Sequence, residues 1–172
     1  MSTVRPLVVL FAGSLMVASV ASGQRPTDAD AINRLIDQYG ATEDAMDMAA
    51  QSRLMSADRV WIVQGAGRRT DQATNMRIQQ AAYDAFKKQA PGLQQFTEDR
   101  DRVIRFHANG AVAIASFYRY TTLVFPPNVP SAVASAPAPR PVAVTLVLEK
   151  REGEWKIVHT HVSELAPSDD DN

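Results

Sequence analysis

The clearest pattern in the chain is the alternation of side chains over residues 153–164. Successive residues of a strand point to opposite faces, so the two faces can be read directly. One face carries Trp155, Ile157, His159 and His161, and the other carries Lys156, Val158, Thr160 and Val162. Apolar residues stand on both faces. This predicts a strand covered on both sides, central in a sheet.

The rest of the chain divides into helices followed by strands. Apolar residues at helical spacing predict a helix that begins at Thr27–Asp28 with Thr27 as N-cap, and two more over 43–56 and 72–88, the last capped by Asp71 or Thr70. Alternating or β-branched stretches predict strands over 60–63, 93–106, 111–125 and 142–150, ahead of the C-terminal strand. Asn109-Gly110 predicts a hairpin. Helices followed by strands indicate an α+β fold with a mostly antiparallel sheet.

The two ends and one internal stretch differ from the globular part. Arg5, an apolar run over 7–20 and the small residues Ala21-Ser22-Gly23 predict a cleaved signal peptide over 1–23. An uncleaved anchor is the alternative. The predicted domain then spans 24–166, with a Pro/Ala-rich loop over 126–141 and an acidic tail over 167–172. We therefore expect a periplasmic or secreted protein that is free of the membrane after signal cleavage.

The composition of the chain argues against several classes of function. The chain has 172 residues, a formal net charge of −1 and no cysteine. The charge and the lack of a basic stripe argue against nucleic-acid binding. Without cysteine there is no disulfide, thiolate nucleophile or cysteine-ligated metal. We predict no cofactor and no metal.

Three stretches carry a resemblance to a known family. Residues 155–163 (Trp-Lys-Ile-Val-His-Thr-His-Val-Ser) resemble the last strand of the SnoaL-like branch of the nuclear transport factor two-like superfamily. They are also similar to the association domain of calcium/calmodulin-dependent protein kinase II. Residues 55–61 and 67–71 resemble two further segments, and the likeness covers about 28–165. It implies a cone-shaped α+β barrel: three N-terminal helices on a curved, mostly antiparallel sheet, with an apolar pocket between them.

The same resemblance addresses catalysis. Ketosteroid isomerases of this superfamily use a tyrosine, a carboxylate base and a protonated aspartic acid. Their tyrosine corresponds to Tyr39, but the two carboxylate positions correspond to Val63 and Thr145. A valine cannot take a proton, so that mechanism is rejected. A rearranged site, with Tyr39 or Tyr118 and a carboxylate among Asp37, Asp44 and Asp99, stays open, and whether the protein is an enzyme is left undecided.

The resemblance also assigns the faces of the sheet. The predicted ligand pocket consists of Tyr39, Trp61, Val63, Phe86, Ile114, Ser116, Tyr118, Tyr120, Thr145, Val158, Thr160 and Val162. The predicted subunit interface, on the convex face, consists of Leu146, Leu148, Ile157, His159 and His161. Arg119 has convex parity and is expected to be a surface charge. Each pocket residue also fits an ordinary core, and a register slip of one residue would reverse the faces.

The histidines allow three interpretations. His159 and His161 fit a subunit interface, pocket chemistry or a metal site, although no third metal ligand is indicated. We favour the interface, and expect His107 to be a solvated turn residue. The favoured function is an exported homodimeric module that binds a small apolar ligand, such as a polyketide-like or steroid-like molecule. The alternatives are an isomerase, cyclase or dehydratase and a pure oligomerisation domain.

Overall fold

Three helices precede and flank a single six-stranded sheet. The computed structural model describes residues 25–63, 67–130 and 139–165. Its elements are α1 (Arg25–Asp44), α2 (Met48–Ser52), β1 (Met55–Val63), β2 (Gly67–Arg69), α3 (Gln72–Gln89), β3 (Gln94–His107), a 3-10 turn (Ala108–Gly110), β4 (Val112–Val124), β5 (Val142–Arg151) and β6 (Glu154–Glu164). The strand order is β2-β1-β6-β5-β4-β3. Only the β1–β6 pair is parallel. The predicted α+β fold is confirmed.

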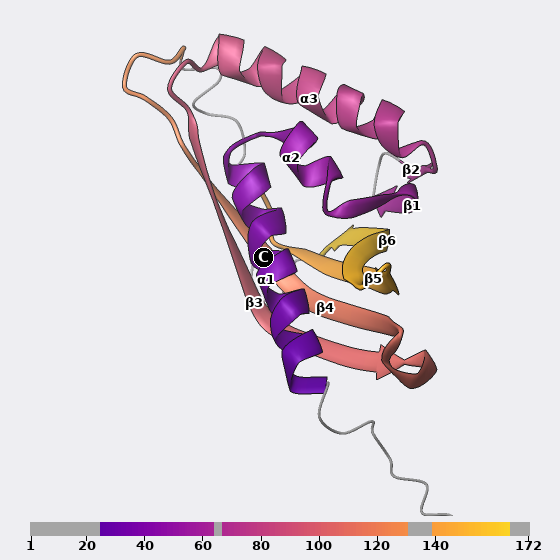
Figure 1. The fold of residues 1–172 in the computed structure, drawn as a ribbon. Helices are drawn as coiled ribbons and strands as arrows, with labels where there is room; N and C mark the ends of the chain where they lie inside the picture. The colour runs from indigo at the N-terminus through magenta and orange to yellow at the C-terminus, as the bar shows by residue number, and fades with distance from the viewer. Residues whose placement is uncertain (1–24, 64–66, 131–138, 166–172) are drawn as a thin grey trace, which may run out of the picture.

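The helices cover one face of the curved sheet, as Figure 1 shows. Helix α1 lies along the sheet. Helix α3 crosses the end of the sheet where β3 begins and β4 ends, away from the turn that joins these two strands. The core lies between α1 and the sheet. From α1 it includes Ile32, Leu35, Ile36 and Tyr39, and from the strands it includes Ala115, Phe117, Leu146, Leu148, Trp155 and Ile157. This side is called the inner face below, and the opposite side the outer face.

Helix boundaries differ from the sequence prediction. Helix α1 begins at Arg25 and continues through Gly40 to Asp44, so the predicted N-cap at Thr27 is wrong. The predicted second helix over 43–56 exists, but it is limited to Met48–Ser52. The chain leaves the helix at Met46, whose φ is 53°. The backbone N–H of Ala50 then donates to the Asp47 carboxylate at 2.8 Å, and this capping bond begins the short α2.

Two other local predictions, the cap of α3 and the turn of the β3–β4 hairpin, are confirmed. Asp71 caps α3 by accepting from the Thr74 backbone N–H at 2.9 Å. Asn109 and Gly110 turn the β3–β4 hairpin with φ of 55° and 91°, the left-handed region that these residues tolerate best. Residues 67–69 pair with β1 as a sixth strand, which the sequence pattern did not predict. The predicted signal peptide over 1–23, the acidic tail over 167–172 and residues 131–138 of the Pro/Ala-rich loop lie outside the described residues.

A β-bulge in β6 changes the face assignment. Leu148 pairs with Ile157 and Val147 with His159, so Val158 is left without a partner in β5. An extra residue in one strand reverses the alternation that follows it. Trp155 and Ile157, before the bulge, are therefore buried on the inner face, as Thr160 is after it. His159 and His161 flank Thr160 and take the outer face, as predicted.

The parity predicted for β4 and β5 is wrong. Leu146 pairs with Thr160 and with Ala115, and all three are at most 1% exposed on the inner face. Leu146 and Leu148 are therefore core residues together with Ile157, and they cannot form the predicted interface. By the same register Ile114, Ser116, Tyr118, Tyr120 and Thr145 take the outer face, where Ile114 is 36% and Tyr118 41% exposed.

Candidate functional site

An arginine lies at the centre of the inner face. The Arg119 guanidinium donates to both carboxylate oxygens of Asp99 at 2.8 Å and to Glu43 Oε2 at 2.6 Å. It stacks 4.5 Å from the centre of the Tyr39 ring, and the side chain is 6% exposed. Burial alone would lower the pKa of Arg119, but the Glu43 charge and the Asp99 hydrogen bonds raise it. The sequence prediction of a surface charge is therefore wrong, and Arg119 joins β4, β3 and α1.

Tyr39 and Glu43 lie one turn apart on α1, so both side chains face the same region. Burial, reinforced by the nearby Glu43 carboxylate, raises the pKa of Tyr39 to about 12. Burial also raises the pKa of Glu43, against the opposing effect of Arg119. The Glu43 side chain is nevertheless 18% exposed, whereas that of Asp99 is 3% exposed. Glu43 is therefore the more accessible carboxylate of the pair, and Tyr39 keeps its proton at neutral pH.

A second buried arginine lies on β1. Arg59 is 1% exposed and donates to Thr160 Oγ1 at 3.1 Å and to Gln72 Oε1 at 3.2 Å. Gln72 in turn contacts the sulfur of Met55. These contacts tie the start of α3 to β1 and β6. The inner face thus carries two buried cations in addition to its apolar core.

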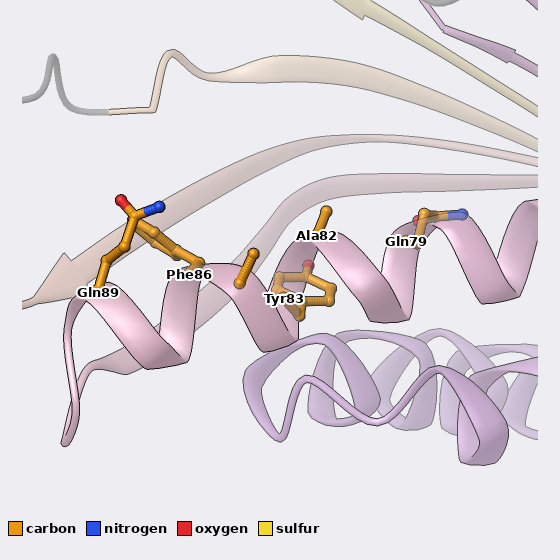
Figure 2. Close-up of a pocket in the computed structure, with 6 residues that line it drawn as sticks. Gln79, Ala82, Tyr83, Phe86 and Gln89 are labelled. Carbon is orange, nitrogen blue, oxygen red and sulfur yellow. The ribbon is translucent and has the colours of Figure 1, made fainter.

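A pocket of about 450 Å³ runs along α3 (Figure 2). The described residues that line it are Gln79, Ala82, Tyr83, Ala85, Phe86 and Gln89. Phe86 also packs edge-on against Phe125 with ring centres 6.2 Å apart. The volume lies within the range of small-molecule sites. Apolar side chains and amide and hydroxyl groups share its lining.

Tyr83 connects this pocket to the inner polar group. Burial and the nearby Glu43 charge raise the pKa of Tyr83 to about 12, with a smaller effect from Tyr39. Its hydroxyl therefore stays protonated at neutral pH. A ligand in the α3 pocket would contact the aromatic rings of Tyr83 and Phe86 and the Tyr83 hydroxyl.

The predicted pocket residues divide between the two faces. The inner face carries Trp61 and Val63 of β1, Thr160 and Val162 of β6, and Tyr39 of α1. Phe86 lines the α3 pocket. Val158 lies at the bulge. Three of the outer-face residues, Ser116, Tyr118 and Thr145, do come together, but in a pocket of about 400 Å³ on the outer face. There the Ser116 and Thr145 hydroxyls are 3.4 Å apart.

Sequence reasoning missed the charged members of the inner face. Arg119 continues the parity of Ala113, Ala115 and Phe117, all buried, and this small and apolar series is the signal that could have placed it inside. Glu43 was assigned to the start of a second helix, so its place on α1 one turn after Tyr39 was not seen. Arg59 lies just before the predicted strand over 60–63 and is buried as part of β1. Of the open carboxylate candidates, Asp99 is in the inner group, while Asp37 is 62% exposed beside Arg102.

The described residues contain no group of three or more His, Cys, Asp or Glu side chains placed to hold a metal ion. Among the same residues, no helix is both long and apolar enough to cross a membrane.

The comparisons with known proteins agree with this geometry. The family model for the SnoaL-like domain matches residues 32–167, most of the chain, and the protein belongs to this family. A comparison with curated proteins finds no match.

Several solved structures share the fold. An NTF2-like protein with a cystatin-like fold from Novosphingobium aromaticivorans is 18% identical with a TM-score of 0.65, over 92% of this chain and 96% of that one. A nuclear transport factor 2-like superfamily protein from Salmonella enterica is 19% identical with a TM-score of 0.64, over 84% and 95%. A LinA-type hexachlorocyclohexane dehydrochlorinase from Novosphingobium barchaimii is 12% identical with a TM-score of 0.62, over 83% and 90%. At these identities the likeness shows the fold alone.

Proposed function

We propose that the protein binds a small, largely apolar molecule in the α3 pocket. The observation that carries the proposal is the position of Tyr83. It lines a pocket of about 450 Å³ and at the same time packs against the buried core that contains Tyr39, and the charges of Glu43, Tyr39 and Arg119 act on the pKa of its hydroxyl. A ligand with an apolar body and one polar end, such as a polyketide-like molecule, fits that arrangement, because an aromatic lining holds the body while a few polar groups orient the end.

Two further properties belong to the same proposal. The outer face exposes Ile114 and Tyr118 on β4 and Val103 on β3, and it carries His159 and His161 on β6 across the intervening β5. Exposed apolar side chains gathered on one face favour contact with another protein surface. We assign that face to a second copy of the chain. The N-terminal sequence supports export to the periplasm or the medium.

Binding can be tested with two aromatic probes, 2-naphthol and 9,10-anthraquinone, by fluorescence titration of the mature chain. We expect Phe86→Ala to weaken binding about tenfold, which corresponds to about 1.4 kcal/mol. Ile78→Ala is the matched control, since Ile78 is an apolar residue of the same helix that is 48% exposed and does not line the pocket. If neither probe binds, or if both variants weaken binding equally, the proposal is wrong.

A second candidate function is proton transfer. It is favoured by the raised pKa of Glu43 beside Tyr39, because a carboxyl group whose pKa is shifted toward neutrality can take and return a proton. The similar fold of a dehydrochlorinase shows that an enzyme can be built on this scaffold. Glu43 would act as base and the Tyr39 or Tyr83 hydroxyl as hydrogen-bond donor to the developing oxyanion.

This candidate can be tested with 2-tetralone, a two-ring ketone with acidic α-hydrogens, in heavy water. NMR would report exchange of the α-hydrogens for deuterium. If Glu43 is the base, Glu43→Gln should slow the protein-dependent exchange by at least about 100-fold. Asp37→Asn, at an exposed carboxylate of the same helix, should not change it. Exchange no faster than in buffer would leave ligand binding as the only proposal.

A further inference from the structure

A cleft of about 340 Å³ lies where α1 meets the turn between β5 and β6. It takes side chains from residues 31–38 of α1, from residues 53 and 54 between α2 and β1, and from residues 153–156 around the turn. Its volume lies within the range of small-molecule sites. No described residue lines both this cleft and the α3 pocket, so the two cavities are separate.

The apolar part of the cleft is held in place by the core. Leu35 and Trp155 line it, and each is 7% exposed. The Trp155 Nε1–H donates to Asp28 Oδ1 at 3.2 Å, and its ring packs against Phe106 with ring centres 6.0 Å apart. Together with the partly buried Leu54, these side chains form an apolar floor that is in place without a ligand.

The polar part of the cleft is mostly cationic. Arg34, Arg53 and Lys156 line it, against Glu154 as the one carboxylate among the described lining residues. Lys156 is already engaged, because its Nζ lies 2.9 Å from Glu154 Oε2 and donates to the Arg53 carbonyl oxygen at 3.1 Å. The chain as a whole has a formal net charge of −1, so this cleft concentrates positive charge on a weakly acidic protein.

The two arginines keep most of their donors available. The Arg53 guanidinium donates to the Ala49 carbonyl oxygen at 3.3 Å, and within the described part of the chain neither arginine has an ion pair. Each guanidinium has five N–H donors. A negatively charged ligand group is the acceptor that would use them.

The two arginines reach the cleft from elements that are fixed to one another. Arg34 and Gln38 are four residues apart and share one side of α1. Arg53 precedes Leu54, whose carbonyl oxygen accepts from the Ile157 backbone N–H at 3.0 Å, so this segment is tied to β6. The cleft therefore presents donors from two elements above one apolar floor.

We infer that this cleft, called the Arg34 cleft below, binds a small organic acid with a hydrocarbon body. The carboxylate accepts N–H bonds from Arg34 and Arg53, because a guanidinium matches the planar geometry of a carboxylate. The hydrocarbon body lies on the floor formed by Leu35, Leu54 and Trp155, and its removal from water favours such an acid over a bare anion. The inference does not depend on the proposed function, which concerns the α3 pocket.

The test is an NMR titration that follows the indole N–H signal of Trp155 in the mature chain. The chain has two tryptophans, so Trp61→Phe assigns both signals. Three probes are compared at neutral pH: 2-naphthoate, 2-naphthol with the same rings but no carboxylate, and acetate with the carboxylate but no rings. We expect a saturable change with 2-naphthoate and at least about tenfold weaker responses to the other two, because each lacks one of the two interactions.

Three outcomes of this titration overturn the inference. No change of the Trp155 signal with 2-naphthoate means that the cleft does not bind the acid. An equal response to 2-naphthol means that the cations do not recognise the ligand. An equal response to acetate means that the apolar floor does not contribute.

Variants at exposed arginines separate this site from a general effect of charge. Arg34→Met and Arg53→Met should each weaken 2-naphthoate binding at least about tenfold and leave the melting temperature unchanged, since both residues are exposed. Arg105→Met, at an exposed arginine of β3 outside the cleft, should bind 2-naphthoate like the wild type. Unchanged affinity in Arg34→Met, or an equal loss in Arg105→Met, overturns the inference. Phe86→Ala should leave the Trp155 response unchanged, so failure of the α3 pocket and failure of the Arg34 cleft are distinguishable.

Discussion

The two faces of the same sheet differ in which side chains they bury and which they expose. Neighbouring residues of β4 show this directly: Phe117 and Arg119 are buried under the helices, while Tyr118 between them is 41% exposed on the outer face. The inner face places charges within an apolar core and balances Arg119 by direct ion pairs. The outer face carries hydroxyls, aliphatic groups and two histidines. None of the helices in the described part of the chain lies over it (Figure 1). The inner face buries charged side chains and the outer face exposes apolar ones, which is the opposite of what a simple hydrophobic core would show. Each face therefore needs a separate explanation.

The largest expected difference between the faces concerns Arg119. Arg119→Met leaves the Glu43 carboxylate without its bonded cation and Asp99 with the more distant Arg102, whose Nη2 lies 3.8 Å away. Removing one partner of a buried pair costs about 3–5 kcal/mol. Urea unfolding would measure the loss. Arg100→Met is the control, because Arg100 pairs with Glu98 in the exposed part of β3 and such pairs contribute little. An equal loss of unfolding free energy in both variants would mean that the buried ion pairs of Arg119 stabilise the fold no more than the exposed Arg100–Glu98 pair.

A similar contrast is expected for two aliphatic residues on adjacent strands. Leu146 is fully buried, so Leu146→Ala should cost about 2–5 kcal/mol through lost burial and the cavity that remains. Ile114 is 36% exposed on the outer face, and Ile114→Ala should change the free energy of unfolding of the monomer by less than about 1 kcal/mol. Thermal unfolding at low protein concentration measures both. A larger loss at Ile114 would show that the outer face is not free in the monomer.

The proposed second copy is tested by a charge on the outer face. Ile114→Asp should shift the protein from dimer to monomer in light scattering at micromolar concentration and leave 2-naphthol binding unchanged. Ile78→Asp introduces the same charge at an exposed apolar position of α3 and should leave the dimer intact. Wild-type protein that is only monomeric would contradict the assignment of the outer face.

The smallest effects on the free energy of unfolding are expected from pH. Glu43 on the inner face and His159 on the outer face should change it in opposite directions as pH rises. The pKa of Glu43 is raised above its ordinary value of 4.5, so Glu43 costs stability as pH rises through 4.5 and above. The pKa of His159 is lowered below 6.5, chiefly by burial and then by His161 and Arg59, so His159 costs stability as pH falls through 6.5 and below. Denaturant unfolding at several pH values should show each slope flattened in Glu43→Gln and His159→Asn respectively. His107→Gln, at the exposed hairpin tip, is the control for His159.

How far the sequence predicts this structure depends on the range of the interactions. Local signals were sufficient for Asp71 as a cap, for the Asn109-Gly110 hairpin and for the α+β class. The family resemblance, carried by residues 155–163, is confirmed by the SnoaL-like model over 32–167. Local signals failed where a residue's context is set by a distant partner. Helix α1 continues through Gly40, which packs near Thr97 of β3; a Cβ at this position would make an ordinary contact with Thr97 at 3.6 Å, and no local pattern contains that neighbour.

The face assignments failed for one specific reason. Alternation gives the two faces of a strand but not which of them is covered, and the bulge at Val158 changes the count by one residue. His159 and His161 were placed on the outer face correctly, while Leu146 and Leu148 on the neighbouring strand were placed with them in error. A bulge depends on the register between β5 and β6, which a single sequence does not specify.

The central claim is that the helix-covered side serves a ligand and the outer face serves a second copy. Oxidative footprinting of the tyrosines tests it in a single experiment. We predict that 2-naphthol protects Tyr83, that raising the protein concentration protects Tyr118, and that the buried Tyr39 stays unreactive throughout. Protection of Tyr118 by 2-naphthol, or of Tyr83 by protein concentration alone, would contradict the division of the sheet into these two faces.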